Sequence, residues 1–157
     1  MTSRATSARA SSRDKPIEMA GLPNSVGFML RLAQVAAFQG LMAALKPFDL
    51  RASDFSILLI IEANPGLKQQ AVGEALSIKR ANLVSMIDIL EKRDLIVRTV
   101  PKTDKRSYAL SLTDAGRALM VDAKAAEQAH QKMLAALVGE NHGRLIEDLN
   151  RIVARSA

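Results

Sequence analysis

The chain has 157 residues and a formal net charge of +6, and aromatic residues make up only 3% of it. It contains no cysteine, which excludes disulfide bonds, thiolate metal sites and sensing by thiol oxidation. The two histidines lie in no close cluster with Asp or Glu, and no catalytic set can be assembled, so we expect neither a metal site nor a cofactor nor an enzyme.

Residues 1–16 are rich in Ser, Ala, Thr and Arg, carry a net charge of +3 and show no apolar periodicity. We therefore predict a disordered basic tail. Such a tail can act as a solubilising segment or as a basic arm that reaches DNA, and its acid-poor composition also has a faint likeness to a transit peptide. Residues 17–157 are expected to form a single domain.

The stretch 22–45 predicts a long helix that is apolar on almost every side, and such a helix must be buried on several faces. A membrane span is the alternative, but Arg31 lies inside the segment, and a charge near the centre of a lone span is costly. We therefore predict a helix that packs against its own domain and a second subunit, and that ends at Pro47.

Two short helices are expected next. Ser53 and Asp54 predict the start of the first, as cap and first-turn acid, and the run 57–61 is assigned to it although its composition favours a strand. The second is expected over 68–76. Its inward residues are predicted to be Ala71, Val72, Ala75 and Leu76.

Residues 77–92 predict a helix with one apolar face. Leu83, Met86, Ile87 and Leu90 follow the spacing of that face and are assigned to the core. The opposite face carries Arg80, Asn82, Ser85, Asp88 and Lys92, and is polar.

A two-stranded hairpin follows, because the apolar pattern changes to a period of two. Ile96, Arg98 and Val100 mark its first strand, and Tyr108, Leu110 and Leu112 mark one face of its second strand. The loop between them, 101–106, is polar and basic, and residues 77–108 carry a net charge of +4. A helix followed by a basic hairpin is the layout of a winged helix, which suits DNA; a generally solvated basic surface remains the alternative explanation of the charge.

The last part of the chain predicts two helices. Thr113 is a cap, and a heptad-like seam of small and apolar residues runs from Leu119 to Leu137 and includes His130, which we interpret as a satisfied interface histidine. Gly139 ends this helix, and residues 145–153 predict a final amphipathic helix. Together with the first helix, both are expected to form a dimerisation module.

The order of these elements resembles the MarR family of bacterial transcription regulators over about residues 22–155. The most specific piece is the run 104–116, which is similar to the family's wing signature, and 90–96 resembles the end of its recognition helix. The resemblance implies a mainly α fold with a small β-hairpin wing. The winged helix would span about 50–112, flanked by dimerisation helices at about 22–45 and 114–155.

The resemblance also implies which residues contact DNA. The recognition helix would use Lys79, Arg80, Asn82 and Ser85, and the wing would use Lys102, Lys105 and Arg106, with Asp104 steadying it. Arg80 can read guanine and Asn82 can read adenine. The chain departs from the family at Lys79, where a capping Ser or Thr is common, and at Val84 and Ile89, near positions that are often polar or basic.

The implied function is that of a cytoplasmic, homodimeric repressor released from a pseudo-palindromic operator by a small ligand. A twofold dimer would place its recognition helices roughly 34 Å apart. We expect the ligand to be an aromatic acid or its coenzyme A thioester. Candidate pocket residues are Met29, Arg31, Phe38, Met42 and Phe55, with Arg31 facing either a ligand carboxylate or an acid across the dimer. The alternative is a winged helix that coats DNA without sequence preference or contacts protein, and needs no ligand.

Overall fold

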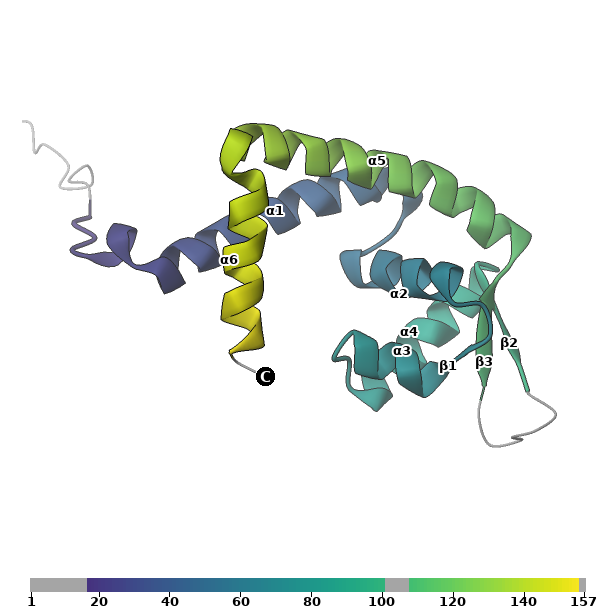
Figure 1. Ribbon diagram of the computed structural model, residues 1–157. Coiled ribbons are helices and arrows are strands. Elements are labelled where there is room, and N and C mark those ends of the chain that lie inside the picture. Colours follow the sequence, from purple (N-terminus) through teal and green to yellow (C-terminus); the bar gives the residue numbers. More distant parts are fainter. Residues whose placement is uncertain (1–16, 101–107, 156–157) are drawn as a thin grey trace, which may run out of the picture. The chain divides into compact units, whose positions relative to one another are not determined.

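The computed structural model describes residues 17–100 and 108–155 (Figure 1). The predicted tail, 1–16, lies outside the described residues. The chain divides into two compact units, residues 1–35 and 36–157, and the boundary falls inside the first long helix. The fold is mainly helical with a small antiparallel sheet, as predicted. The expectation of a single domain over 17–157 stays a prediction.

The first long helix, α1, spans Val26–Leu45 and begins later than predicted. Leu22–Asn24 forms a separate 3-10 turn, and Pro23 lies near its start. A second 3-10 turn, Lys46–Phe48, ends α1, as the proline there predicts. The segment Val26–Phe48 is long and apolar enough to cross a membrane by length and composition alone, with a mean hydropathy of 1.4. Of the residues in α1, Leu45 is the buried one in the single chain, so most of this apolar surface is open.

Helix α2, Ala52–Ala63, confirms the helical assignment of the 57–61 run. Its start differs from the prediction, because Arg51 is the cap position and Ser53 already lies in the first turn. Asp54 closes the turn: its carboxylate accepts the backbone N–H of Arg51 at 3.1 Å. An acid in the first turn also interacts favourably with the helix dipole, so this part of the prediction is confirmed.

Helix α3 spans Gln69–Ala75 and α4 spans Arg80–Lys92. Val72 and Gly73 are the buried residues of α3, whereas Ala75, predicted to point inward, is exposed. A Cβ on Gly73 would lie 3.0 Å from a methyl group of Leu83, so the missing side chain lets α3 and α4 approach closely. The packing face of α4 is as predicted.

The sheet has three strands in the order β1-β3-β2, all antiparallel. The predicted hairpin corresponds to β2, Ile96–Thr99, and β3, Ala109–Leu112, with Ile96 opposite Leu112 and Thr99 opposite Ala109. The third strand, β1, is the pair Leu67–Lys68, which was wrongly predicted as the connection to and start of a helix. It pairs with Leu110 and Ala109, so β3 is the central strand.

The core lies between α2, α4, the sheet and the start of α5 (Figure 1). Ten large side chains are fully enclosed in addition to Leu45. They are Ile57, Leu58, Ile61, Val72, Leu83, Ile87, Leu90, Ile96, Leu110 and Met120. This aliphatic core holds α4 and the hairpin in one lobe.

Helix α5, Asp114–Val138, carries the chain away from the hairpin. Thr113 caps it, as predicted: its hydroxyl oxygen accepts the N–H of Gly116 at 2.9 Å and its hydroxyl group donates to the Asp94 carbonyl. A Cβ on Gly116 would lie 2.0 Å from the Leu95 carbonyl oxygen, so only glycine fits here. The helix ends at Gly139, which has a positive φ of 65°, and after a 3-10 turn α6 spans His142–Ala154.

The interpretation of His130 as an interface residue is wrong. Its ring is buried within the same chain, where Nε2 lies 3.0 Å from the Ala37 carbonyl oxygen. A Cβ on Gly40 would lie 2.3 Å from the imidazole carbon Cε1, so Gly40 provides the space for the ring. His130 therefore joins α5 to the second half of α1. The seam residues beyond it, Met133 and Leu137, are exposed.

Candidate nucleic-acid interface

The outer face of α4 presents polar side chains at its N-terminal end. Arg80, Asn82 and Ser85 are all exposed, as predicted, while Leu83, Ile87 and Leu90 hold the opposite face in the core. Lys79 is the N-cap position, where its ammonium group cannot accept a backbone N–H, and the residue is exposed. The Ser85 hydroxyl donates to the Ala81 carbonyl at 3.4 Å. Arg80 and Asn82 have the side chains on this face that are able to hydrogen-bond to base edges, and their contact with bases stays a prediction.

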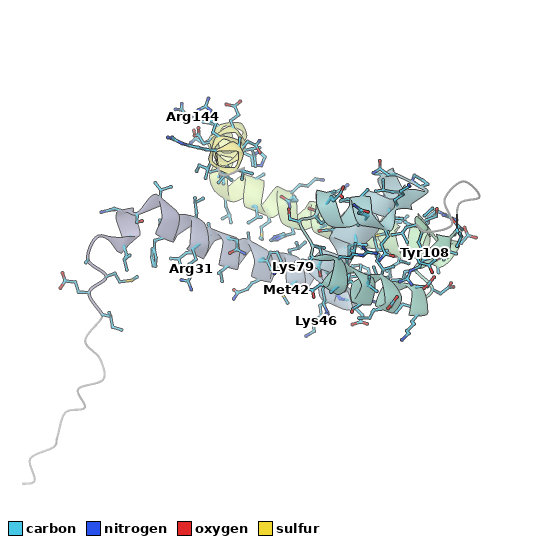
Figure 2. All side chains as sticks on the ribbon, turned by 90° about the horizontal axis from the view of Figure 1, so that it is seen from below. Arg31, Met42, Lys46, Lys79, Tyr108 and Arg144 are labelled. Carbon is cyan, nitrogen blue, oxygen red and sulfur yellow. The ribbon has the colours of Figure 1, made fainter. Side chains whose placement is uncertain are left out.

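A groove of about 670 Å³ lies beside the first turn of α4 and is bounded by α3 and the base of the hairpin. Lys79 and Tyr108, labelled in Figure 2, come from α4 and from the residue just before β3. The backbone N–H of Gln69 donates to the Tyr108 carbonyl at 3.0 Å, which ties the start of α3 to the hairpin. The groove is lined by Gln69, Gln70, Gly73, Glu74, Ser77, Ile78, Lys79, Arg80, Leu83, Val84, Arg98 and Tyr108.

Three residues of this site were not predicted from the sequence: Gln69, Gln70 and Tyr108. Gln70 donates from its amide to the Glu74 carboxylate at 2.8 Å, so one acid on this face is already engaged. Both glutamines are the first residues of α3 and line the groove. The signal available in the sequence was a polar pair at the start of a short helix.

Arg98 connects the hairpin to α4. Its guanidinium group pairs with Asp88 and lies 3.4 Å from the Glu91 carboxylate, both of which are on α4. The same group lies 5.7 Å from the centre of the Tyr108 ring, within the range of a cation–π contact. Arg98 was predicted to lie on a strand, and no role in DNA binding was predicted for it.

Arg93 fixes the other end of α4. Its two terminal nitrogens donate to the carbonyl oxygens of Asp49 at 2.6 Å and Phe48 at 3.0 Å. These carbonyls belong to the segment between α1 and α2, so the end of the recognition helix is held by the chain that leads into the lobe.

The predicted wing-tip residues fall in the segment 101–107, outside the described residues. The roles of Lys102, Lys105 and Arg106 in contacting DNA, and of Asp104 in steadying the wing, therefore stay predictions. The strands β2 and β3 that flank this segment are formed as a wing requires.

The five residues predicted for a ligand pocket have different environments. Phe55 is enclosed in the lobe core, Phe38 and Met42 are exposed on the second half of α1, and Met29 and Arg31 belong to the unit 1–35. Met42 lines a hollow of about 380 Å³. The other residues lining it are Ala43, Lys46, Asp49, Leu50, Arg51, Asp54, Ile89 and Arg93. The set as a whole stays a prediction.

Comparisons with known proteins agree with this geometry. The model of the MarR family matches residues 50–108. A putative transcriptional regulatory protein for the hcr operon of Thauera aromatica is 34% identical over 133 residues, which is 83% of this chain and 80% of that protein.

Two solved structures have a similar fold. The transcriptional repressor CouR bound to a 23-mer DNA duplex is 35% identical, with a TM-score of 0.83 over 89% of this chain and 99% of that one. CouR bound to p-coumaroyl-CoA is 32% identical, with a TM-score of 0.74 over 90% of this chain and the whole of that one.

Proposed function

Because the chain belongs to the MarR family of transcriptional regulators, we propose that it acts as a dimeric repressor that leaves a pseudo-palindromic operator when a small ligand binds. The observation that carries this proposal is the outer face of α4. There Arg80 and Asn82 are exposed beside Lys79, while the helix is fixed by the core on its other side. A rigid helix with base-reading side chains is what a major groove requires.

Dimerisation is supported by the apolar residues that one chain leaves exposed. Met133 and Leu137 on α5 and Leu145, Ile146 and Val153 on α6 are all open to solvent. Several large apolar side chains exposed on two successive helices fit a protein interface. The apolar face of α1 fits the same explanation, so we assign it to a second copy of the chain rather than to a bilayer. The proposed location is accordingly the cytoplasm, where the operator lies.

A ligand with an anionic group and an apolar part is supported by the hollow next to Met42. Met42 and Ile89 give it apolar walls, and its charged lining has one more cation than acids: Lys46, Arg51 and Arg93 against Asp49 and Asp54. Arg93, which holds the end of α4, lines the same hollow, so an occupant would contact the side chain that positions the recognition helix. Together with the p-coumaroyl-CoA complex of CouR, this supports an aromatic acid or its coenzyme A thioester as the ligand class.

The test is DNA-binding anisotropy at fixed salt on the fragment upstream of the protein's own gene, with random duplex as the control. We expect the upstream fragment to bind at least about a thousandfold more tightly, and one aromatic acid or coenzyme A thioester to release it. Equal binding to both duplexes, unaffected by every compound, would contradict the proposal. It would leave a protein that coats DNA without sequence preference or contacts protein.

A further inference from the structure

The recognition helix carries two acids that face the same way. Asp88 and Glu91 are one turn apart on α4, and their side chains are 44% and 39% exposed. Carboxylates on a helix that enters a DNA groove lie within a Debye length of phosphates, where like charges repel. Two unpaired carboxylates at this position would oppose the positive charge that Lys79, Arg80 and Lys92 supply on the same helix.

Arg98 pairs with both acids at once. One terminal nitrogen meets the Asp88 carboxylate, and the other lies 3.4 Å from Glu91. The Arg98 side chain is only 18% exposed, so it is less accessible than either acid that it pairs with. Its Nε is buried and has no hydrogen-bond partner among the described residues. Its contacts with the two carboxylates are therefore made by the two terminal nitrogens.

The position of Arg98 on β2 makes the contact a link between two elements that both face the groove. Its guanidinium lies against Tyr108, at the start of the strand that leads out of the wing. Since Arg98 and Tyr108 both line the groove beside the first turn of α4, the link fixes the base of the wing relative to the recognition helix. A two-pronged guanidinium suits this task, whereas a lysine ammonium offers one point charge.

We propose that Arg98 is a positioning residue for DNA binding, which acts by neutralising Asp88 and Glu91 so that these two acids of α4 do not repel the DNA phosphates. The proposal deepens the proposed function and rests on it, because α4 must be the helix that enters the DNA. Arg98 does its work through the two carboxylates, and it contributes no phosphate contact of its own. This distinguishes it from Arg80 and Lys79, whose charges face outward.

The test is a mutant cycle read by DNA-binding anisotropy on the upstream fragment and on random duplex across a salt series. Arg98→Gln is expected to weaken binding to the upstream fragment at least about tenfold. Adding Asp88→Asn and Glu91→Gln to that variant should restore affinity to within about threefold of the wild type or better. In the wild-type background the same two substitutions should change affinity by less than about threefold.

Lys92→Gln is the matched control, because it removes one exposed positive charge from the same helix. Neutralising Asp88 and Glu91 should improve this variant no more than it improves the wild type, since general electrostatics acts equally in both backgrounds. Arg98→Met retains an apolar stem over the Tyr108 ring, and it replaces Arg98→Gln in the cycle if the glutamine variant unfolds at the assay temperature.

Two results separate the proposal from its competitors. If neutralising the two acids leaves Arg98→Gln as weak as before, with a salt slope lower by about one, then Arg98 is a direct phosphate contact and the proposal is wrong. If the wild type shows no preference for the upstream fragment, the proposed function fails instead. The rescue can then still be read on random duplex, so the two failures are distinguishable.

Discussion

In the lobe built from α2, α3, α4 and the sheet, large apolar side chains such as Ile57 and Leu90 have no exposed surface, whereas on α6 Ile146 is 46% exposed and Val153 is 69% exposed. The lobe therefore completes its core within one chain. Helix α6 has the same kind of residues at helical spacing, and within residues 17–100 and 108–155 they are left exposed. The difference is that the lobe buries its own apolar side chains, whereas the exposed apolar side chains of α6 fit the dimer that we propose.

The charged side chains differ in the same way. In the lobe, Arg93 and Arg98 each bridge two elements through several contacts. On α6, labelled at Arg144 in Figure 2, the ion pairs of Asp148 with Arg144 and Arg151 lie within one helix and on its exposed face. Exposed pairs of that kind contribute little to stability, so they serve mainly to keep the polar face soluble.

The difference in packing between the two regions can be tested most directly by replacing one glycine with alanine in each. Gly116→Ala would place a Cβ 2.0 Å from the Leu95 carbonyl oxygen, so the helix or the strand end must move. We expect a loss of about 3 kcal/mol in the free energy of unfolding, measured by urea denaturation. Gly143→Ala on α6 is the control, because nothing lies within 4 Å of its Cβ, and it should change stability by less than about 1 kcal/mol. Equal losses would show that the two regions are packed alike.

The second prediction concerns the exposed face of α6. Ile146→Asp with Val153→Asp should weaken dimerisation on the order of a hundredfold, because each charge would be buried without a partner in the interface. Sedimentation equilibrium measures the dissociation constant. Glu147→Lys, on the polar face of the same helix, should leave it within about threefold. A double variant that stays as dimeric as the wild type would remove α6 from the interface.

Arg80→Ala tests base reading by α4. It should cost about 1–3 kcal/mol of operator binding and relax the base preference at one position in each half-site. Competition anisotropy with operators altered at single base pairs measures both effects. Arg144→Ala removes another exposed arginine, on α6, and should change neither. Even weakening on every sequence would make Arg80 a phosphate contact without specificity.

The smallest expected effect is at the junction of the two regions. The Lys124 ammonium on α5 contacts both carboxylate oxygens of Glu62 on α2, at 2.7 and 2.8 Å, and both side chains are about one-third exposed. Lys124→Gln should lower the free energy of unfolding by about 0.5–1 kcal/mol, as thermal denaturation can measure. If adding Glu62→Gln restores the free energy of unfolding, the loss comes from the ion pair between Lys124 and Glu62. A loss of several kcal/mol would show that the junction is part of the core.

The sequence was most informative where apolar periodicity was clear. The packing face of α4, the Thr113 cap and the helical assignment of 57–61 were all predicted and are confirmed. The hairpin is confirmed too, but Val100 and Tyr108, which were predicted to mark its strands, lie just outside β2 and β3. Each of these depends on local spacing and capping chemistry, which a single sequence contains. The exposed polar face of α4 was predicted from the same local spacing.

Features that depend on distant partners were not predicted. The two-residue strand Leu67–Lys68 forms because it pairs with Leu110 and Ala109 of β3, and so short a run has no periodicity that would predict it. His130 occupies a seam position in sequence, but the space for its ring is provided by Gly40, which lies ninety residues earlier. The glycine inside a long apolar helix was the available sign of a close approach.

Arg98 is one of the site residues that were not predicted from the sequence. Its partners Asp88 and Glu91 precede it on another element, and pairing them requires knowing how β2 returns along α4. A cation alternating with apolar residues on a short strand was the hint, because a charge there needs a partner.

Selection of bound sequences from a pool of random duplexes tests the central claim most directly, since it requires both base reading and a symmetric dimer. The account predicts an enriched inverted repeat, with half-site centres about one helical turn, or roughly 10 base pairs, apart. Enrichment of a single unpaired half-site would contradict the dimer, and a pool without any enriched sequence would contradict base reading by α4.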